Sequence, residues 1–376
     1  MTAAAGLYVH VPYCVRRCAY CSFVLTTDFS SRERYFEALR AEADLAAAEA
    51  EGVSFDSLYL GGGTPSSVPS SAIAELADHL AARFAFDGDS EVTIEANPDD
   101  VDADSVRAWR SAGATRVSVG IQSFRDGELR AIDRTHTGED AERALDLLAA
   151  GGFSVSADLM IGIPGQPPEG SPDDATRLSK APVSHVSVYM LELDKAGRMA
   201  EDRRRRPDRY LSDDAQADAY LEVGRVLAGA GFRHDEVSSW SRPGAEARHN
   251  AKYWRRVPTV GLGVGAHELW QERRRANTAS IGAYLDALSR GARPTASDQP
   301  IDALEREREE IILPARTRDG IPAEGIDRWL AERGDSALRD DWGRWTEAGL
   351  IERRGDRYVL TERGFLVSNE ILCRFV

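Results

Sequence analysis

Short apolar, β-branched runs alternate with longer helical patterns through the first half of the chain, and this alternation constrains the fold more than any other feature. The predicted strands are 7–11, 57–60, 91–95, 116–121, 154–161 and 185–193. The helices expected between them are 30–51, 72–84, 104–112, 139–150 and 172–179. Because most of them are long enough for a parallel crossover, we predict an α/β fold with a parallel sheet, either open and doubly wound or curved into a barrel.

Residues with chemically useful side chains or a flexible backbone cluster at the carboxyl ends of these predicted strands. They are Cys14, Gly61–Thr64, Glu95, Gln122, Asp158 and Gly162. In α/β barrels and open α/β sheets, ligands bind at this edge. The sequence therefore predicts one site assembled from several strand ends.

The second half of the chain has a different pattern. Segment 213–231 is expected to be a helix, 232–240 a strand, 291–302 a linker, and the run Arg203–Arg206 a solvated loop. Beyond residue 302, helical patterns at 305–312, 323–332 and 337–348 precede two short strands, 350–354 and 358–360, around a Gly-Asp turn. We predict a small winged-helix-like α+β module. The expected domains are 1–240 (core), 241–295 (an extension that closes the barrel) and 296–376 (the module).

Charge and cysteine content narrow the function classes. With 47 basic and 62 acidic residues, the formal net charge is −15, which argues against nucleic acid as a partner. We find no signal peptide and no apolar stretch of the roughly 18–20 residues that a membrane span needs. Three of the four cysteines lie within eight residues, and Cys373 is expected to be an ordinary thiol. A reduced, cytoplasmic protein with a chemically active cysteine cluster is expected.

The cysteine cluster Cys14, Cys18 and Cys21 has the spacing C-x3-C-x2-C. Soft thiolates select zinc, copper(I) or iron–sulfur clusters. A four-iron cluster on three cysteines leaves one iron open for a small ligand, as a reactive site requires. The alternative is a zinc site with His10 as a fourth ligand.

The cluster and its flanking motifs carry a resemblance to a known superfamily. The motifs are Tyr8–Cys14 (YVHVPYC), Gly61–Pro65 (GGGTP), Glu95–Pro98 (EANP), Gly120–Phe124 (GIQSF), Asp133–Thr137 (DRTHT) and Asp158–Gly165 (DLMIGIPG). In this order they resemble the coproporphyrinogen dehydrogenase-like branch of the radical S-adenosylmethionine (SAM) superfamily, and within it the HemW family of heme chaperones. The resemblance implies a partial (β/α)6 barrel with a [4Fe-4S] cluster on the three cysteines.

The resemblance also implies a set of SAM contacts. The residues expected to contact SAM are Tyr8, Tyr20, Gly62, Gly63, Thr64, Glu95, Gln122, Arg134 and Asp158. Among these, the glycine loop offers backbone groups, and the arginine forms a bidentate pair with a carboxylate. For each residue alone, the alternative is a surface or loop-capping side chain whose polar groups are already hydrogen-bonded.

Two histidine motifs lie beyond the core. His249-Asn-Ala-Lys-Tyr253-Trp254 resembles the HNxxYW motif linked to heme binding in the HemW family, with the imidazole on iron and the two aromatic rings beside the macrocycle. The alternative is a packed histidine beside two core aromatics. Gly261–His267 resembles a GxGxGAH loop that closes over the SAM end. His10 and His267 are the candidate catalytic residues.

Two main functions follow from the resemblance. The first is a chaperone that binds heme as cargo and passes it to an acceptor apoprotein. The second is a radical SAM enzyme (a methylase, cyclopropanase or porphyrinogen oxidase) that generates a 5′-deoxyadenosyl radical, with a reductase or flavodoxin-type protein as electron donor. Coproporphyrinogen dehydrogenase carries a further cysteine after the third, and here Ser22 and Phe23 follow Cys21, which favours the chaperone. A third function, tRNA modification, is opposed by the acidic charge balance.

Overall fold

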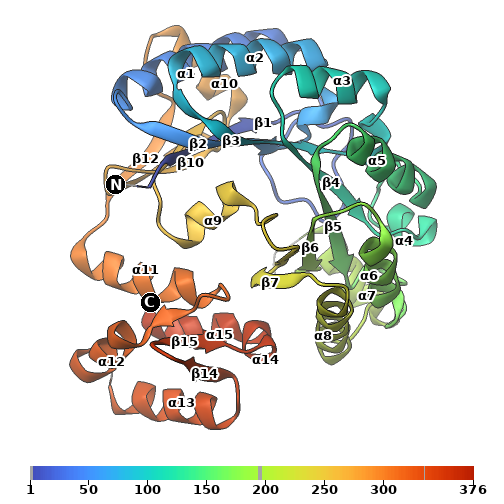
Figure 1. Ribbon diagram of the computed structural model, residues 1–376. Coiled ribbons are helices and arrows are strands. Elements are labelled where there is room, and N and C mark those ends of the chain that lie inside the picture. The colour runs from blue at the N-terminus through green and yellow to red at the C-terminus, as the bar shows by residue number, and fades with distance from the viewer. Residues whose placement is uncertain (1–2, 194–196, 334) are drawn as a thin grey trace.

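The computed structural model describes residues 3–193, 197–333 and 335–376, and it contains a twelve-stranded sheet and a separate three-stranded sheet (Figure 1). Six strands of the large sheet run parallel in sequence order. They are β1 (Ala5–Val11), β2 (Ser54–Gly62), β3 (Ala85–Ala96), β4 (Arg116–Gln122), β5 (Ser154–Ile161) and β6 (His185–Met190). The predicted α/β fold with a parallel sheet is confirmed.

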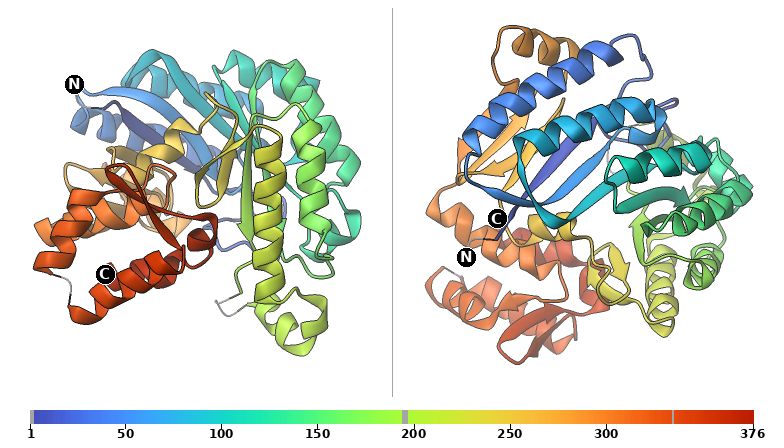
Figure 2. Two further views of the ribbon diagram at one scale, coloured as in Figure 1. Left: turned by 60° about the horizontal axis from the view of Figure 1, so that its bottom comes forward. Right: turned by 45° about the horizontal axis from the view of Figure 1, so that its top comes forward.

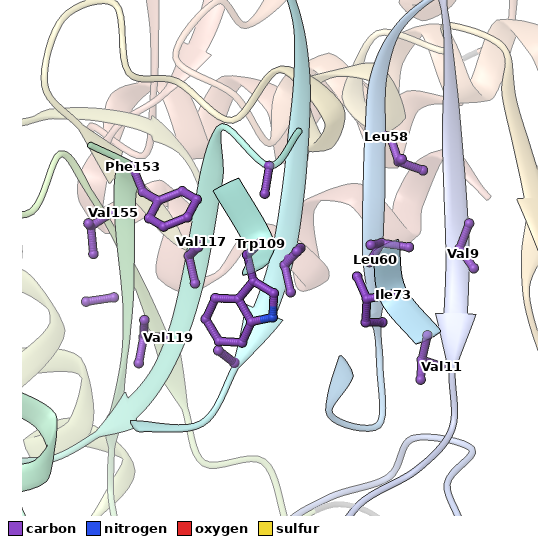
Figure 3. Close-up of a cluster of buried hydrophobic side chains, with 14 of the residues drawn as sticks. Val9, Val11, Leu58, Leu60, Ile73, Trp109, Val117, Val119, Phe153 and Val155 are labelled. Carbon is purple, nitrogen blue, oxygen red and sulfur yellow. The ribbon is translucent and has the colours of Figure 1, made fainter. Parts of the chain in front are cut away.

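Helices cover the convex face of this curved sheet (Figure 1). They are α1 (Arg32–Glu49), α2 (Ser70–Arg83), α3 (Ala103–Ser111), α4 (Asp126–Ala131), α5 (Gly138–Ala150), α6 (Gly170–Lys180) and α8 (Asp213–Gly229). The apolar residues of each strand face them, and Figure 3 shows Val9, Leu60 and Val117 on strands with Trp109 of α3. Burial of this apolar face is the main driving force for the fold.

Additional strands extend the parallel core at both edges. Next to β1 lie β9 (Thr259–Leu262), which is parallel to it, and then the antiparallel strands β10 (His267–Trp270), β11 (Arg273–Asn277) and β12 (Thr295–Pro300). Next to β6 lie the antiparallel strands β8 (Ser239–Ser241) and β7 (Arg233–Glu236). Because β12 and β7 are the two ends of the strand order, the sheet is a partial barrel rather than a closed one.

Some segments differ from the sequence predictions, among them 232–240, which forms the antiparallel strands β7 and β8 instead of one strand. The linker predicted over 291–302 is wrong, because Thr295–Pro300 forms β12, and its pairing with β11 places it in the large sheet. The loop predicted over Arg203–Arg206 is also wrong, since Arg203–Arg205 end α7 (Arg198–Arg205). In that helix, i,i+4 pairs with Glu201 and Asp202 balance the arginines that suggested a loop.

The C-terminal part forms a small α+β module with its own apolar core. Its elements are α11 (Ala303–Ala315), β13 (Ile321–Pro322), α12 (Ala323–Glu332), α13 (Ser336–Glu347), β14 (Ile351–Arg354), β15 (Arg357–Leu360), α14 (Glu362–Leu366) and α15 (Ser368–Leu372). The three helices and the hairpin agree with the winged-helix-like pattern. Cys373 is exposed in a short 3₁₀ helix that follows α15. Over the described ranges, the helices are too short or too polar to cross a membrane.

Helix α9 (Arg248–Trp254) lies between the large sheet and this module (Figures 1 and 2). It contacts β2 on one side and α11 on the other. Ion pairs connect the two bodies, among them Arg256 with Glu309 at 2.6 Å and Arg318 with Asp235 at 3.2 Å. The segment that carries the histidine motif is therefore held by both parts of the chain.

Candidate functional site

The concave face of the parallel sheet is lined by polar residues, and we call this lined space the lumen. Along each strand, glycine or polar residues alternate with the apolar residues that face the helices. The lumen residues are Gly6, Tyr8, His10, Ser57, Tyr59, Gly61, Glu91, Thr93, Glu95, Arg116, Ser118, Gly120, Ser156, Asp158, His185, Ser187 and Tyr189. A lumen of this polarity suits a ligand with hydrogen-bonding groups rather than an apolar core.

The cysteine loop follows β1 at the carboxyl edge of the sheet. Cys14 is buried, and its Sγ lies 2.9 Å from Thr64 Oγ1, whereas Cys18 and Cys21 are half-buried. The Arg17 guanidinium donates to three carbonyl groups of residues 21–25 and so orders the loop. Three thiols in one ordered loop form the soft donor set that an iron–sulfur cluster needs.

The position of His10 favours the cluster over the zinc alternative. One imidazole nitrogen lies 3.1 Å from the Tyr8 hydroxyl, and the other lies 2.7 Å from the Val24 carbonyl oxygen. Across residues 3–193, 197–333 and 335–376, no three cysteine, histidine or acidic side chains converge on a point suited to a single ion. A cubane does not require such a point, because its three thiolates bind three different irons.

The glycine loop after β2 packs against the cysteine loop. Gly62 N donates to Glu95, Gly63 N to Val11 O, and Thr64 N to Tyr13 O, so the amides among the backbone groups expected near SAM are already hydrogen-bonded within the protein. A Cβ on Gly63 would lie 2.6 Å from the Pro12 carbonyl carbon. The glycines here allow two backbones to approach each other closely.

Glu95 and Asp158 bring two carboxyl groups to the lumen. Glu95 accepts hydrogen bonds from the Tyr59 hydroxyl at 2.7 Å and from Gly62 N at 3.0 Å. Burial raises the pKa of Glu95, and burial together with the Glu95 charge raises the pKa of Asp158 to about 7. Two buried acids, one of which raises the pKa of the other, favour a ligand carrying an amine or hydroxyl groups.

Arg134 lies beside the cysteines, where one N–H group points at Cys18 Sγ over 3.7 Å and another donates to the Gly120 carbonyl. Its Nε is buried without a hydrogen-bond partner. A Cβ on Gly120 would lie 2.7 Å from the guanidinium, so glycine makes room for it. A buried unpaired donor beside three thiols matches the expected contact with a ligand carboxylate.

Backbone conformation at two further positions is unusual. Gln122, at the end of β4, has φ +66°, which costs about 1–3 kcal/mol for a residue that is not glycine and is typical of functional sites. Asp133 has φ +61°, a conformation that aspartate tolerates better than most residues. Tyr20 packs with Ile132 and Met160 near these residues, and the Arg134 charge acts on the Tyr20 phenol.

His249 is buried at the amino-terminal end of the lumen, where it contacts strands β1 and β2. Its Nδ1 lies 3.0 Å from Ser57 Oγ, its Nε2 lies 2.9 Å from the Tyr253 hydroxyl, and its ring stacks on Tyr59 with 5.2 Å between the centroids. Burial, with a smaller contribution from Lys252, lowers the pKa of His249 to about 3. The imidazole is therefore neutral, which is the form that binds metals.

Tyr253 and Trp254 do not face the same side of α9. Tyr253 contacts His249 and has an exposed fraction of 44 %. Trp254 instead lines a cavity between α9, the start of β6 and the module, together with His185, Asp235 and Arg318. The structure does not support the expectation that both rings flank one macrocycle, because adjacent residues on a helix point about 100° apart.

The loop at 261–267 lies beside the cysteine end. A Cβ on Gly263 would lie 2.5 Å from the His10 carbonyl oxygen, and one on Gly265 would lie 2.9 Å from Val24. His267 begins β10 with an exposed side chain, and no hydrogen bond from it to the cysteine loop or lumen is present among the described residues. His10 thus lies in the lumen, whereas His267 is not brought to it by any such contact.

Sequence reasoning missed two sets of residues. Tyr59 and Ser57 contact the candidate residues directly, and the period-two alternation Ser-Leu-Tyr-Leu-Gly over 57–61 contained the signal for them. Glu42 on α1 holds the loop at 261–267, because it accepts hydrogen bonds from Gly263 N and the Tyr284 hydroxyl, each at 2.7 Å. A lone glutamate in an Ala/Glu-rich helix carries no such signal.

Comparison with known proteins agrees with this geometry. The family model of the Radical SAM superfamily matches residues 8–178. The heme chaperone HemW of Mycobacterium tuberculosis is 36% identical over 98% of this chain and 93% of its own length. The heme chaperone HemW of Escherichia coli is 34% identical over 99% of this chain and 98% of its own length. In structure, the chain matches the radical SAM enzyme coproporphyrinogen III oxidase (HemN) from Escherichia coli with a TM-score of 0.84. That match covers 100% of this chain and 90% of the other at 20% identity, so it shows the shared fold.

The partial barrel with its cysteine loop and polar lumen defines a radical SAM protein, a class whose members use a [4Fe-4S] cluster and SAM. Within this superfamily, the chain belongs to the HemW family. The resemblance seen in the sequence motifs is confirmed.

Proposed function

We propose that the chain is a heme chaperone that binds heme at His249 and passes it to an acceptor apoprotein. The observation that carries this proposal is a buried, neutral imidazole whose Nε2 has only a tyrosine hydroxyl as partner. When the proton is on Nδ1, the ring donates to Ser57 and keeps a lone pair on Nε2 for iron. The similarity over the full length to proteins named heme chaperones supports the same conclusion.

In this proposal, Cys14, Cys18 and Cys21 hold a [4Fe-4S] cluster, and the lumen residues hold SAM. The residues present fit these groups, because the donor set is three thiols and Arg134 has a buried Nε without a partner. When bound, the cluster supplies single electrons to SAM. Arg134 orients a carboxylate, Glu95 and Asp158 bind amine or hydroxyl groups, and Thr64 hydrogen-bonds the Cys14 sulfur. The electron donor, a reductase or flavodoxin-type protein, belongs to the same proposal.

Heme titration of the anaerobically reconstituted protein tests the heme site. We expect a shifted Soret band in the wild type and loss of this shift in His249→Ala. The matched control is His79→Ala on the outer helix α2, where the ring contacts Asp44 and lies away from the lumen. Equal Soret spectra for all three proteins would contradict the proposal.

Metal analysis tests the cluster. Reconstituted protein is expected to carry about four irons per chain, and a Cys18→Ala variant is expected to lose them. Stoichiometric zinc in protein purified without oxygen would overturn the cluster assignment.

A second candidate function is a radical SAM enzyme acting on an organic substrate. The unpaired Arg134 Nε beside the thiols and the two lumen carboxyls favour it, since these groups fit intact SAM. Formation of 5′-deoxyadenosine that depends on an added substrate would support the enzyme. Formation of only a trace, whatever the substrate, would support the chaperone.

A further inference from the structure

Tyr59 lies between the two ligand sites of the proposed function. Its ring stacks on the His249 imidazole, with 5.2 Å between centroids and 30° between planes. Its hydroxyl donates to Glu95 Oε1 over 2.7 Å. One rigid side chain thus contacts both the imidazole proposed for heme and a carboxylate proposed for SAM.

Two glycines leave the space that these contacts need. A Cβ on Gly61 would lie 2.7 Å from a Tyr59 ring carbon and 3.0 Å from the Glu95 carboxyl carbon. A Cβ on Gly6 would lie 3.2 Å from the His249 ring. A side chain at either position would collide with these groups, so glycine at both positions allows Tyr59 to contact the imidazole and the carboxylate together.

We propose that Tyr59 is a positioning residue that couples heme binding at His249 to SAM binding at Glu95. This inference rests on the proposed function. A SAM molecule that engages Glu95 fixes the carboxylate, the carboxylate fixes the Tyr59 hydroxyl, and the ring then presents His249 in one orientation. Since coupling between two sites is reciprocal, heme tightens SAM binding by the same factor that SAM tightens heme binding.

The expected size of the coupling follows from the single hydrogen bond that transmits it. A neutral donor on a buried carboxyl group corresponds to about a five-fold change in affinity, which is at the lower end of known couplings. Other lumen contacts of Tyr59 are with the Tyr8 ring, which stacks at 6.1 Å and has no hydrogen bond to Glu95.

The test measures both affinities in reconstituted protein with an oxidised cluster and no reductant. Heme affinity is obtained from Soret titrations with and without saturating SAM, and SAM affinity from equilibrium dialysis with and without heme. In the wild type, we expect about a five-fold tightening in each direction. Tyr59→Phe keeps the stacked ring and removes the hydroxyl, and we expect the coupling to fall below about 1.5-fold.

Two further variants complete the design. Gly61→Ala keeps the hydroxyl but forces the ring and the carboxyl group apart, so it is expected to lose the coupling as well. Tyr220→Phe removes a buried hydroxyl that donates to Val237 O, away from the lumen, and it is expected to keep the coupling. Circular dichroism verifies that each variant is folded.

The outcomes separate the inference from the function on which it rests. Coupling that survives in Tyr59→Phe overturns the role of Tyr59, whatever the result for Gly61→Ala. Heme binding in the wild type that is independent of SAM overturns the inference and leaves the chaperone function standing. Absence of heme binding to the wild type overturns both.

Discussion

In the proposed heme site, iron would compete with the Tyr253 hydroxyl for one nitrogen of His249. Nε2 of His249 lies 2.9 Å from the Tyr253 hydroxyl, and Nδ1 is engaged by Ser57. Ligation of heme iron by Nε2 therefore requires this hydrogen bond to break. Tyr253→Phe removes the hydroxyl and keeps the ring, so we expect the variant to bind heme more tightly than the wild type.

The magnitude follows from the net contribution of one hydrogen bond. A neutral hydrogen bond contributes about 0.5–1.5 kcal/mol, and the variant no longer has to break it on binding. At about 0.59 kcal/mol for RT, 1 kcal/mol corresponds to roughly a five-fold lower heme dissociation constant. The same loss is expected to lower the free energy of unfolding by about 0.5–1.5 kcal/mol. The change in affinity and the change in stability thus have opposite signs.

Soret titration gives the dissociation constant, and urea denaturation gives the free energy of unfolding. A control is Tyr210→Phe, whose hydroxyl donates to Met199 O and Asp202 outside the lumen. Tyr210→Phe is expected to leave heme affinity unchanged. Heme binding by Tyr253→Phe that is as weak as that of His249→Ala would refute the reasoning, because it would make the phenol, rather than the imidazole, the group that binds heme.

Three further predictions concern other buried groups. Burial raises the pKa of Glu42 from 4.5 to about 7, so the stabilisation from its bound proton is present below pH 4.5 and is lost as the pH rises to 7. The free energy of unfolding should therefore fall by at most about 3 kcal/mol over this range, and urea denaturation should show that Glu42→Gln removes this fall. Thr64→Val removes the hydrogen bond to Cys14 Sγ and should make the cluster's reduction potential more negative in an EPR-monitored titration, whereas an unchanged potential would exclude that bond as a determinant. Gly6→Ala places a Cβ 3.2 Å from the His249 ring and 2.8 Å from the Lys252 side chain, so it should weaken heme binding in a Soret titration. A heme affinity equal to that of the wild type would show that the His249 ring has room to move.

Much of the core followed from the sequence because its signals are local. The strand over 154–161 was predicted with the bounds found for β5. The other parallel strands differ from their predicted ranges by one to three residues at an end, except β3, which begins six residues before its predicted start. A period of two along a strand and the turn residues between elements are set by neighbours in the chain. The motif order of the cysteine loop and the strand ends was enough to identify the superfamily, since it places thiols and polar side chains at one edge of a parallel sheet.

Tertiary structure alone decided how the two proposed ligand sites are related. His249 and Ser57 are hydrogen-bonded although 192 positions separate them, and Glu42 and Gly263 are 221 positions apart. Neither local sequence indicates that α9 returns to the concave face of the sheet, or that Tyr253 contacts His249 while Trp254 lines a separate cavity. Such contacts depend on the path of the whole chain, because side chains distant in sequence meet only after the sheet has curved and its helices have packed on the convex face.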